Sequence, residues 1–349
     1  MSDIGKWWSG PVSSEPDFEN LLKVLRKQKP ARPTLFEFYV NERVQCILAP
    51  EAQDWPKTRR LGADALTIAA FRNAGYDYVS LHGSDFYFPT GQIEHRQTIS
   101  INDGALISDW ASFESYPWPD PAKFSYDRLQ ELKGYLAGNM KIIVFGPYGL
   151  LETAIQLVGF EKLCYMLADN SKLAQAIFDA IGSRLLKYYQ ICLEYDSVGA
   201  IIGNDDWGFK TQTMFSATDM RKYVIPWHKK IVALAHEKGR AAIIHSCGNL
   251  ANVMDDIIDD IGYDGKHSFE DGIMPVESAY DRYYSRIAIL GGLDINFMVN
   301  STPEMVFKRA RAMLERSQAK GSYALGTGNS VPEYIPDENY FAMIAAVRE

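Results

Sequence analysis

Eight short apolar segments alternate with helical patterns along most of this chain, and this alternation limits the possible folds most strongly. Each segment has the length of a short strand, and the stretches between them have the apolar spacing of amphipathic helices. The segments are residues 34–39, 76–81, 141–145, 198–202, 241–244, 264–269, 287–292 and 323–325. Strands that alternate with helices form parallel sheets with right-handed crossovers, and eight such units close a barrel. The sequence therefore predicts an α/β fold, a (β/α)8 TIM barrel, as one domain over residues 1–349.

Two regions lie outside this repeat. Residues 1–30 form an N-terminal helical extension, in which Trp7, Trp8 and the helical run 18–25 are expected to pack across one end of the core. Residues 86–121 form an insertion after the second strand, and its Asn-Asp-Gly sequence at 102–104 predicts a β-hairpin over 98–107. A doubly wound open sheet is the alternative fold. No G-x-G-x-x-G motif follows the first strand, so a Rossmann nucleotide site has no support.

Composition excludes several classes of partner. The 349 residues carry a formal net charge of −8 without a run of Lys or Arg, which argues against nucleic-acid binding. No stretch of about 18 apolar residues predicts a membrane span, and the first residues lack an apolar signal region, so we expect a cytoplasmic protein. The four cysteines are scattered and predict reduced thiols rather than disulfides.

The fifth predicted strand ends in two good metal ligands, His245 and Cys247. With one residue between them on an extended backbone, both side chains leave on the same side. In a barrel this strand end carries the chemistry, and Zn²⁺ is the ion that most often takes an imidazole with a thiolate. A buried Cys and a strand-end His are also common as packing residues, so the motif alone leaves both interpretations open.

The same rim of the predicted barrel collects polar groups from other strand ends. We expect His82 and Asp85 to act as acid or base and Asp205 to be catalytic. The residues expected to bind substrate are Glu37, Asn204, Asp206, Asp294 and Asn329. Any one of these could instead cap a helix or brace a loop, so their convergence on one rim is the argument. The remaining histidines, His95, His228 and His236, are expected to be surface or packing residues.

An ordered set of motifs resembles the uroporphyrinogen decarboxylase-like superfamily from about residue 59 to 349. The segments that carry the resemblance are 102–104 (NDG), 116–121 (YPWPDP), 146–149 (GPYG), 205–209 (DDWGF), 225–227 (IPW), 245–248 (HSCG), 326–332 and 338–339. The resemblance implies a (β/α)8 barrel, in agreement with the strand count.

The superfamily contains decarboxylases and cobalamin-linked methyltransferases. Decarboxylases carry an arginine-rich N-terminal segment that binds substrate carboxylates, whereas residues 36–42 here are apolar and acidic and would repel a polycarboxylate. Ser84-Asp85 does resemble the strand-end Asp of decarboxylases. On balance the chain is more similar to the methyltransferase branch.

That branch implies Zn²⁺ held by a His and two Cys, of which His245 and Cys247 match the first two. Thr327 stands at the third position, so we expect Glu270, or alternatively His267, to complete the ligand set. The resemblance implies methyl transfer between a small molecule and a corrinoid on a partner protein, and leaves a homodimer open. Fewer thiolates make a harder site, which favours a methyl ether or methylamine over a thiol.

Two other functions remain as alternatives. One is a metal-independent decarboxylase-like lyase acting on a small carboxylated substrate, with a buried carboxylate at Asp85 or Asp205. The other is a non-catalytic barrel that binds a small ligand.

Overall fold

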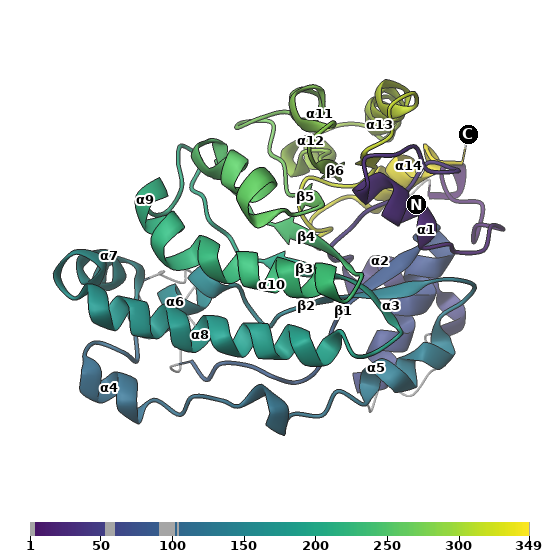
Figure 1. Ribbon diagram of the computed structural model, residues 1–349. Helices are drawn as coiled ribbons and strands as arrows, with labels where there is room; N and C mark the ends of the chain where they lie inside the picture. The colour runs from purple at the N-terminus through teal and green to yellow at the C-terminus, as the bar shows by residue number, and fades with distance from the viewer. Residues whose placement is uncertain (1–3, 53–59, 91–101, 103–104, 349) are drawn as a thin grey trace.

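The computed structural model describes residues 4–52, 60–90, 102 and 105–348 of the chain. Its centre is a curled sheet of seven parallel strands, each paired with the next in sequence order. The strands are β1 Tyr78–His82, β2 Lys141–Phe145, β3 Val198–Asn204, β4 Ala241–His245, β5 Gly265–His267, β6 Ala288–Leu290 and β7 Tyr323–Ala324. Helices surround the sheet (Figure 1), and the predicted TIM-barrel fold is confirmed.

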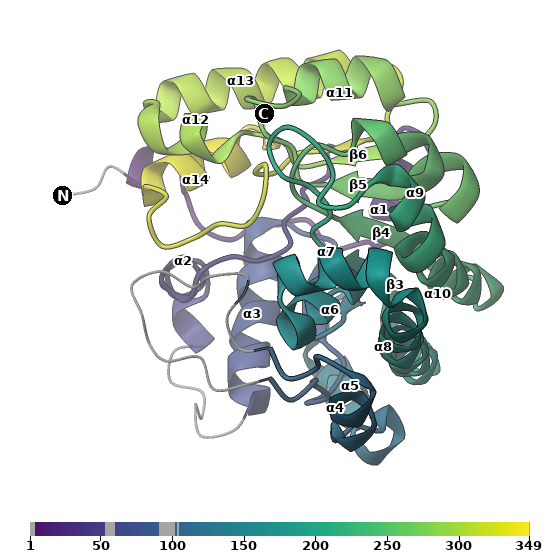
Figure 2. The same cartoon turned by 90° about the vertical axis from the view of Figure 1, so that its left-hand side faces the viewer.

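The helices follow the strands in the predicted alternation. In chain order they are α1 Glu19–Leu25, α2 Glu42–Leu48, α3 Arg60–Ala74, α4 Trp110–Ser115, α5 Arg128–Glu131, α6 Leu150–Val158, α7 Phe160–Asp169, α8 Ser171–Cys192, α9 Ala217–Asp219, α10 Ile225–Glu237, α11 Val276–Tyr283, α12 Ile295–Asn300, α13 Pro303–Ser317 and α14 Asp337–Ala345. Figure 2 looks toward α6 and α7, with α8 and α10 side by side at one flank of the sheet. No helix among the described residues is long and apolar enough to cross a bilayer.

The strand register brings the ends of neighbouring strands level. Asn204 pairs with His245, and His245 pairs with His267. Because the strands are parallel, these polar residues share one edge of the sheet at which β3, β4 and β5 end. The interior below them is apolar, as in β2, where Ile142, Ile143 and Val144 are fully buried.

Residues 34–40 occupy the eighth position between β7 and β1 without forming a regular strand. On the β7 side, Phe36 N donates to Leu325 O at 2.7 Å. On the β1 side, the bonds come from side chains: the Tyr78 hydroxyl donates to Glu37 O at 2.6 Å, and the Ser80 hydroxyl donates to Phe38 O. The predicted strand 34–39 is therefore correctly placed but wrong as a strand, because side chains replace the backbone ladder toward β1.

Other local predictions also need correction. The stretch 86–118 has no clear helical pattern in the sequence, yet it contains α4, which begins at a capping box between Asp109 and Ser112. The sequence pattern predicts one helix near 126–137, and the structure instead has α5 followed by a 3-10 turn, Leu132–Tyr135. The sequence pattern also predicts a helix over 250–261, where the structure has a 3-10 turn, Ala251–Val253, and a π-helix, Asp256–Ile261. Most of the predicted hairpin over 98–107 lies outside the described residues.

The N-terminal segment packs as expected across one end of the core. A Cβ added at Gly199, near the start of β3, would lie 2.5 Å from the Phe18 ring, and one at Gly265, the start of β5, would lie 2.7 Å from Leu25. These glycines allow α1 and the residue before it to cover the amino ends of the strands. Trp8 contacts the Phe341 ring of α14 at 5.3 Å between centroids.

Candidate metal centre

The loops that follow β3 and β4 touch at a pair of glycines. A Cβ added at Gly248, where φ is +83°, would lie 2.1 Å from the carbonyl oxygen of Gly208. Next to this contact, Asn249 N donates to Phe209 O at 2.8 Å. Only residues without a side chain permit this approach. The approach brings Asp206 and Cys247 together, because Cys247 N donates to Asp206 Oδ1 at 2.8 Å.

Three possible metal ligands converge at this point: Asp206, His245 and Cys247. Their donor atoms all lie within 4.8 Å of one another, and Cys247 Sγ lies 3.8 Å from His245 Nε2. In a tetrahedral zinc site, bond lengths of about 2.0–2.3 Å place ligand atoms roughly 3.3–3.8 Å apart. A carboxylate, an imidazole and a thiol are all zinc ligands, so the donor set and its spacing fit this ion with small side-chain movements.

A chain of hydrogen bonds orients His245 for this role. His267 Nε2 lies 3.3 Å from Thr327 O, and since a carbonyl only accepts, that ring nitrogen is the donor. Burial holds the pKa of His267 well below its usual value and lowers that of His245 to about 4, so both rings are neutral. His267 Nδ1 then accepts from His245 Nδ1 at 2.8 Å. The lone pair of His245 is left on Nε2, which faces Cys247, and such outer hydrogen bonds are typical of metal-binding histidines.

The Cys247 thiol lies in a half-buried position between hydrogen-bond donors. Asn329 Nδ2 lies 3.2 Å and Ser268 Oγ 3.4 Å from the sulfur. Burial and the neighbouring Asp206 carboxylate raise the pKa of the thiol to about 12. The raised pKa favours the protonated thiol. A bound metal cation reverses this, because a thiol that coordinates a metal loses its proton.

Thr327 is hydrogen-bonded to Glu37 and to the carbonyl oxygen of Asn329. Its backbone N–H and hydroxyl donate to Glu37 Oε1 and Oε2, at 2.6 and 2.8 Å. Both residues are fully buried, and burial raises the pKa of Glu37 to about 8. The structure therefore places Glu37, predicted to bind substrate, beneath the rim as the partner of Thr327.

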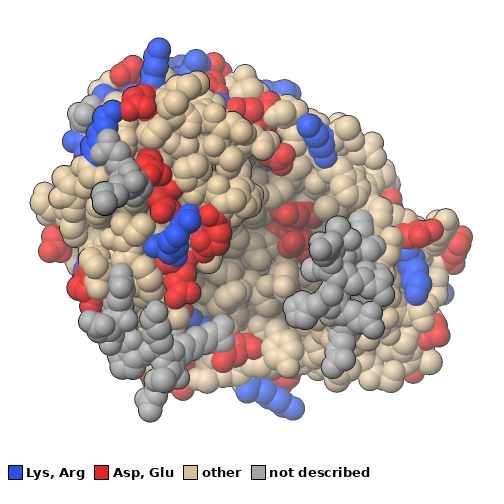
Figure 3. All heavy atoms as spheres, turned by 180° about the vertical axis from the view of Figure 1, so that it is seen from behind, with Lys and Arg blue, Asp and Glu red and all other residues tan. Residues whose placement is uncertain are grey.

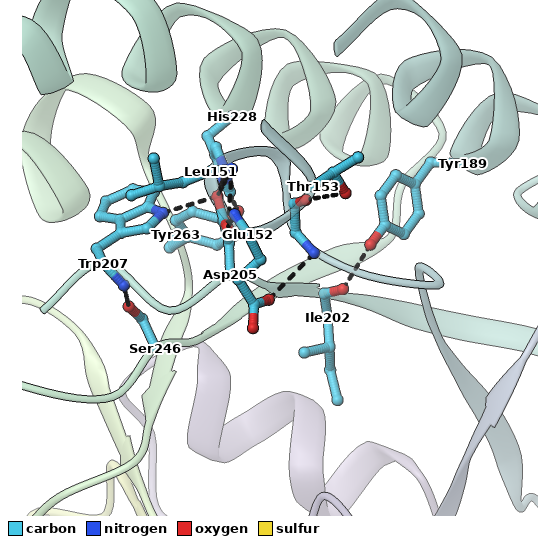
Figure 4. Close-up of polar contacts among 11 residues, drawn as sticks. Leu151, Glu152, Thr153, Tyr189, Ile202, Asp205, Trp207, His228, Ser246 and Tyr263 are labelled. Atoms are coloured by element: carbon cyan, nitrogen blue, oxygen red, sulfur yellow. Dashed lines mark hydrogen bonds and ion pairs between the residues drawn. The ribbon is translucent and has the colours of Figure 1, made fainter. Parts of the chain in front are cut away.

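Both oxygens of the Asp205 carboxylate accept hydrogen bonds, within the group of polar contacts drawn in Figure 4. The carboxylate accepts from Leu151 N and Glu152 N at the start of α6, at 3.0 and 3.1 Å. It also accepts from Trp207 Nε1 at 2.8 Å and from His228 Nε2 at 3.0 Å. The structure thus places Asp205, predicted to be catalytic, as a brace between the loop after β3, α6 and α10. His228 is a buried packing residue, as predicted.

Two ionisable residues beside the candidate centre, the partly buried Glu152 and the buried Lys266, were not predicted from the sequence. Glu152, in the first turn of α6, lies near Asp205 and Asp206, and burial together with these carboxylates raises its pKa to about 8. Lys266 lies within β5, and burial lowers its pKa to about 8. The sequence does contain a signal for each residue: Glu152 stands three residues after Gly149 at the start of a helix, and Lys266 is a lysine inside a strand.

The remaining residues predicted for the site have different positions relative to the three donors. Glu270, predicted as the third metal ligand, lies outside the described group of three donors, and Asp206, predicted to bind substrate, is in it. Asp294 caps α12 by accepting from Phe297 N at 3.0 Å and also accepts from Asp271 N at 2.9 Å. Asn204 Oδ1 accepts from Gly146 N at 3.1 Å.

His82 and Asp85 differ in their relation to the centre. The His82 ring contacts Phe145 at 4.0 Å between centroids; Phe145 contacts Phe38, and Phe38 contacts His245. The Asp85 side chain is 67% exposed, and its Oδ1 lies 3.9 Å from Arg128 Nη1. The buried carboxylate that a decarboxylase-like function requires is therefore not found at Asp85.

A cavity of about 420 Å³ opens beside Cys247. Its wall is formed by residues from the loops after β4 to β7: Cys247, Glu270, Asp294, Ile295, Asn296, Gly328, Asn329, Ser330, Pro332 and Tyr334. The molecule is also hollowed on the face shown in Figure 3, where acidic side chains lie on the wall of the hollow. The cavity next to Cys247 is large enough for a small metabolite.

Comparison with known proteins identifies the family. The family model described as uroporphyrinogen decarboxylase (URO-D) matches residues 18–349. The chain belongs to this family. A curated relative of this URO-D family protein is the methylcobamide:CoM methyltransferase MtbA of Methanosarcina acetivorans, 29% identical over 347 residues, which cover 95% of this chain and 97% of the relative.

A solved structure supports the fold of this URO-D family protein. A methyltransferase from Methanosarcina mazei superposes with a TM-score of 0.67 at 15% identity, over 94% of this chain and 97% of that one. The MtbA relative confirms the resemblance to the methyltransferase branch that the sequence motifs indicated.

Proposed function

We propose that this protein is a zinc-dependent methyltransferase that moves a methyl group between a small molecule and a corrinoid carried by a partner protein. The observation that carries the proposal is the convergence of Asp206, His245 and Cys247, whose donor atoms lie within 4.8 Å of one another at the rim. The 29% identity to a methylcobamide:CoM methyltransferase supports the class of reaction.

Asp206, His245 and Cys247 would hold the ion, in place of the expected set with Glu270. Bound there, zinc would act as a Lewis acid that binds the reacting sulfur, oxygen or nitrogen of the small molecule. With a thiol as acceptor, a sulfur–carbon bond forms, the cobalt–carbon bond breaks with its electron pair left on cobalt, and the thiol proton is released.

The protein's own residues have distinct parts in this proposal. His267 fixes the His245 ring with its lone pair toward Cys247, at an Nδ1–Nδ1 distance of 2.8 Å. Asn329 donates to the Cys247 sulfur and lines the cavity in which the small molecule would bind. Asp205 braces the loop that carries Asp206, and this part is proposed in place of direct catalysis.

Metal content and methyl transfer test this proposal together. Protein purified without added metal should contain about one zinc per chain by elemental analysis, and methylcobalamin should lose its methyl group to a small thiol. Cys247→Ala should abolish both, whereas Cys164→Ala, which replaces a half-buried thiol on α7, should leave both unchanged.

Two results would reject the proposal. One is wild-type protein that binds no zinc even when zinc is offered and the excess removed. The other is methyl transfer at the wild-type rate in Cys247→Ala. The first result would favour the metal-independent lyase or the ligand-binding barrel.

A further inference from the structure

The cavity beside Cys247 has an unbalanced charge. Glu270 and Asp294 lie in its wall, and no Lys or Arg is among the described residues that line it. The Asp294 oxygens are bonded to backbone N–H groups. The Glu270 carboxylate has no hydrogen bond or ion pair with any other described residue, although its residue is only partly exposed. Glu270 is therefore the group that a bound molecule meets.

The nearby cation, Lys266, lies outside the wall of this cavity, and the negative charge of Glu270 is one of the influences that raise its pKa. Lys266 lines a second cavity that shares Glu270 with the first. Its Nζ donates to Ser268 O at 2.5 Å and lies 3.4 and 3.5 Å from the carbonyl oxygens of Ser246 and His267. Three carbonyl oxygens thus surround the Lys266 ammonium group, which keeps its positive charge.

Other side chains of the cavity wall also suit a positively charged ligand. Tyr334 presents an aromatic ring that is 67% exposed, and the π-face of such a ring attracts cations. Asn296 and Ser330 add amide and hydroxyl oxygens that accept hydrogen bonds. A positively charged N–H donor finds acceptors throughout this cavity, whereas a sulfonate or carboxylate meets Glu270 and no Lys or Arg in the described wall.

We infer that the small-molecule substrate carries an ammonium group, which binds at Glu270 while the methyl-exchanging atom lies at Cys247. This inference rests on the proposed methyl transfer for the identity of the reacting end, and on the cavity for the charged end. The substrate expected in this cavity is therefore a cation, and Glu270 is the residue that sets the preference for positive charge.

Matched thiols of opposite charge test the inference. The probes are 2-aminoethanethiol, 2-mercaptoethanol and 2-mercaptoethanesulfonate, which share a two-carbon thiol and differ in charge. Calorimetric titration of the zinc-loaded protein should give a Kd about tenfold lower for the ammonium thiol than for the neutral one, and a weaker affinity still for the sulfonate. Methyl transfer from methylcobalamin should follow the same order in kcat/KM.

Variants of Glu270 test whether this residue sets the preference for the ammonium thiol. Glu270→Gln should remove the preference for the ammonium thiol and Glu270→Lys should reverse it, both with unchanged zinc content. Glu333→Gln, which removes an exposed carboxylate outside the cavity wall, serves as the matched control and should keep the wild-type order.

The outcomes separate this inference from the proposed function. Methyl transfer that favours the sulfonate or the neutral thiol, or a Glu270→Gln protein with the wild-type order, would overturn the inference alone. Binding that prefers the ammonium thiol without any methyl transfer would support the charged site and reject the methyltransferase.

Discussion

Replacing Asp205 by alanine should destabilise the fold strongly. The carboxylate accepts from Leu151 N, Glu152 N, Trp207 Nε1 and His228 Nε2, all at 2.8–3.1 Å, and its side chain has no exposure. Each buried donor left without an acceptor costs about 1–3 kcal/mol, and neighbouring losses are not additive. We therefore expect the free energy of unfolding to fall by about 4 kcal/mol, a large part of the usual 5–15 kcal/mol.

Urea unfolding followed by circular dichroism at pH 7 measures this loss. Asp205→Asn retains one acceptor oxygen and should lose about half as much as the alanine variant. Asp196→Ala, which removes an exposed carboxylate, should stay within about 0.5 kcal/mol of wild type. A loss below about 1 kcal/mol in Asp205→Ala would refute the bracing role and return Asp205 to the candidates for direct catalysis.

Three further predictions concern the residues around the centre. Thr327→Val should keep the zinc content and lower stability by about 1–2 kcal/mol, because it removes a hydrogen bond to Glu37 and no metal ligand; loss of zinc would contradict this. His267→Phe should weaken zinc binding about 10–100-fold in competition with a chromogenic chelator, because His245 loses the acceptor that orients it; an unchanged affinity would exclude that role. Glu37→Gln should gain stability relative to wild type as pH rises from 4.5 to 8. Burial raises the Glu37 pKa to about 8, so the unfolded wild type releases this proton in that window while the folded protein keeps it, and wild type loses on the order of 4 kcal/mol; parallel urea-unfolding profiles against pH would disprove it.

The sequence predicted the barrel because strand and helix periods are local properties. Runs such as Ile142–Val144 have the same apolar character in the sequence as in the buried sheet. Segment 34–40 could not be distinguished from a strand, because the hydroxyls that replace its ladder come from Tyr78 and Ser80, about 40 residues further along the chain. Hydrogen-bond partners at that separation leave no local pattern.

The candidate centre was predicted in part for a similar reason. His245 and Cys247 lie on one strand end, so their spacing alone places them on the same side. The third donor comes from another loop. Which aspartate of that loop can bind a metal depends on which carboxylate oxygens already accept hydrogen bonds. Asp205 and Asp206 are adjacent and identical in chemistry, yet the backbone N–H groups at the start of α6 donate hydrogen bonds to Asp205. Lys266 was missed because a charged residue within a short strand weakens the apolar pattern used to find strands.

The eighth position of the barrel also has a consequence for how the chain is made. Leu35 lies beside Leu325, and Glu37 bonds to Thr327, a partner 290 residues later in the sequence. During synthesis, residues 34–40 leave the ribosome long before β7 exists, so the barrel stays open until nearly the whole chain has emerged. A nascent chain that ends before residue 320 has Asp206, His245 and Cys247 but no partner for Glu37. Closure of the barrel and completion of the rim beside the candidate centre are thus one late event in folding.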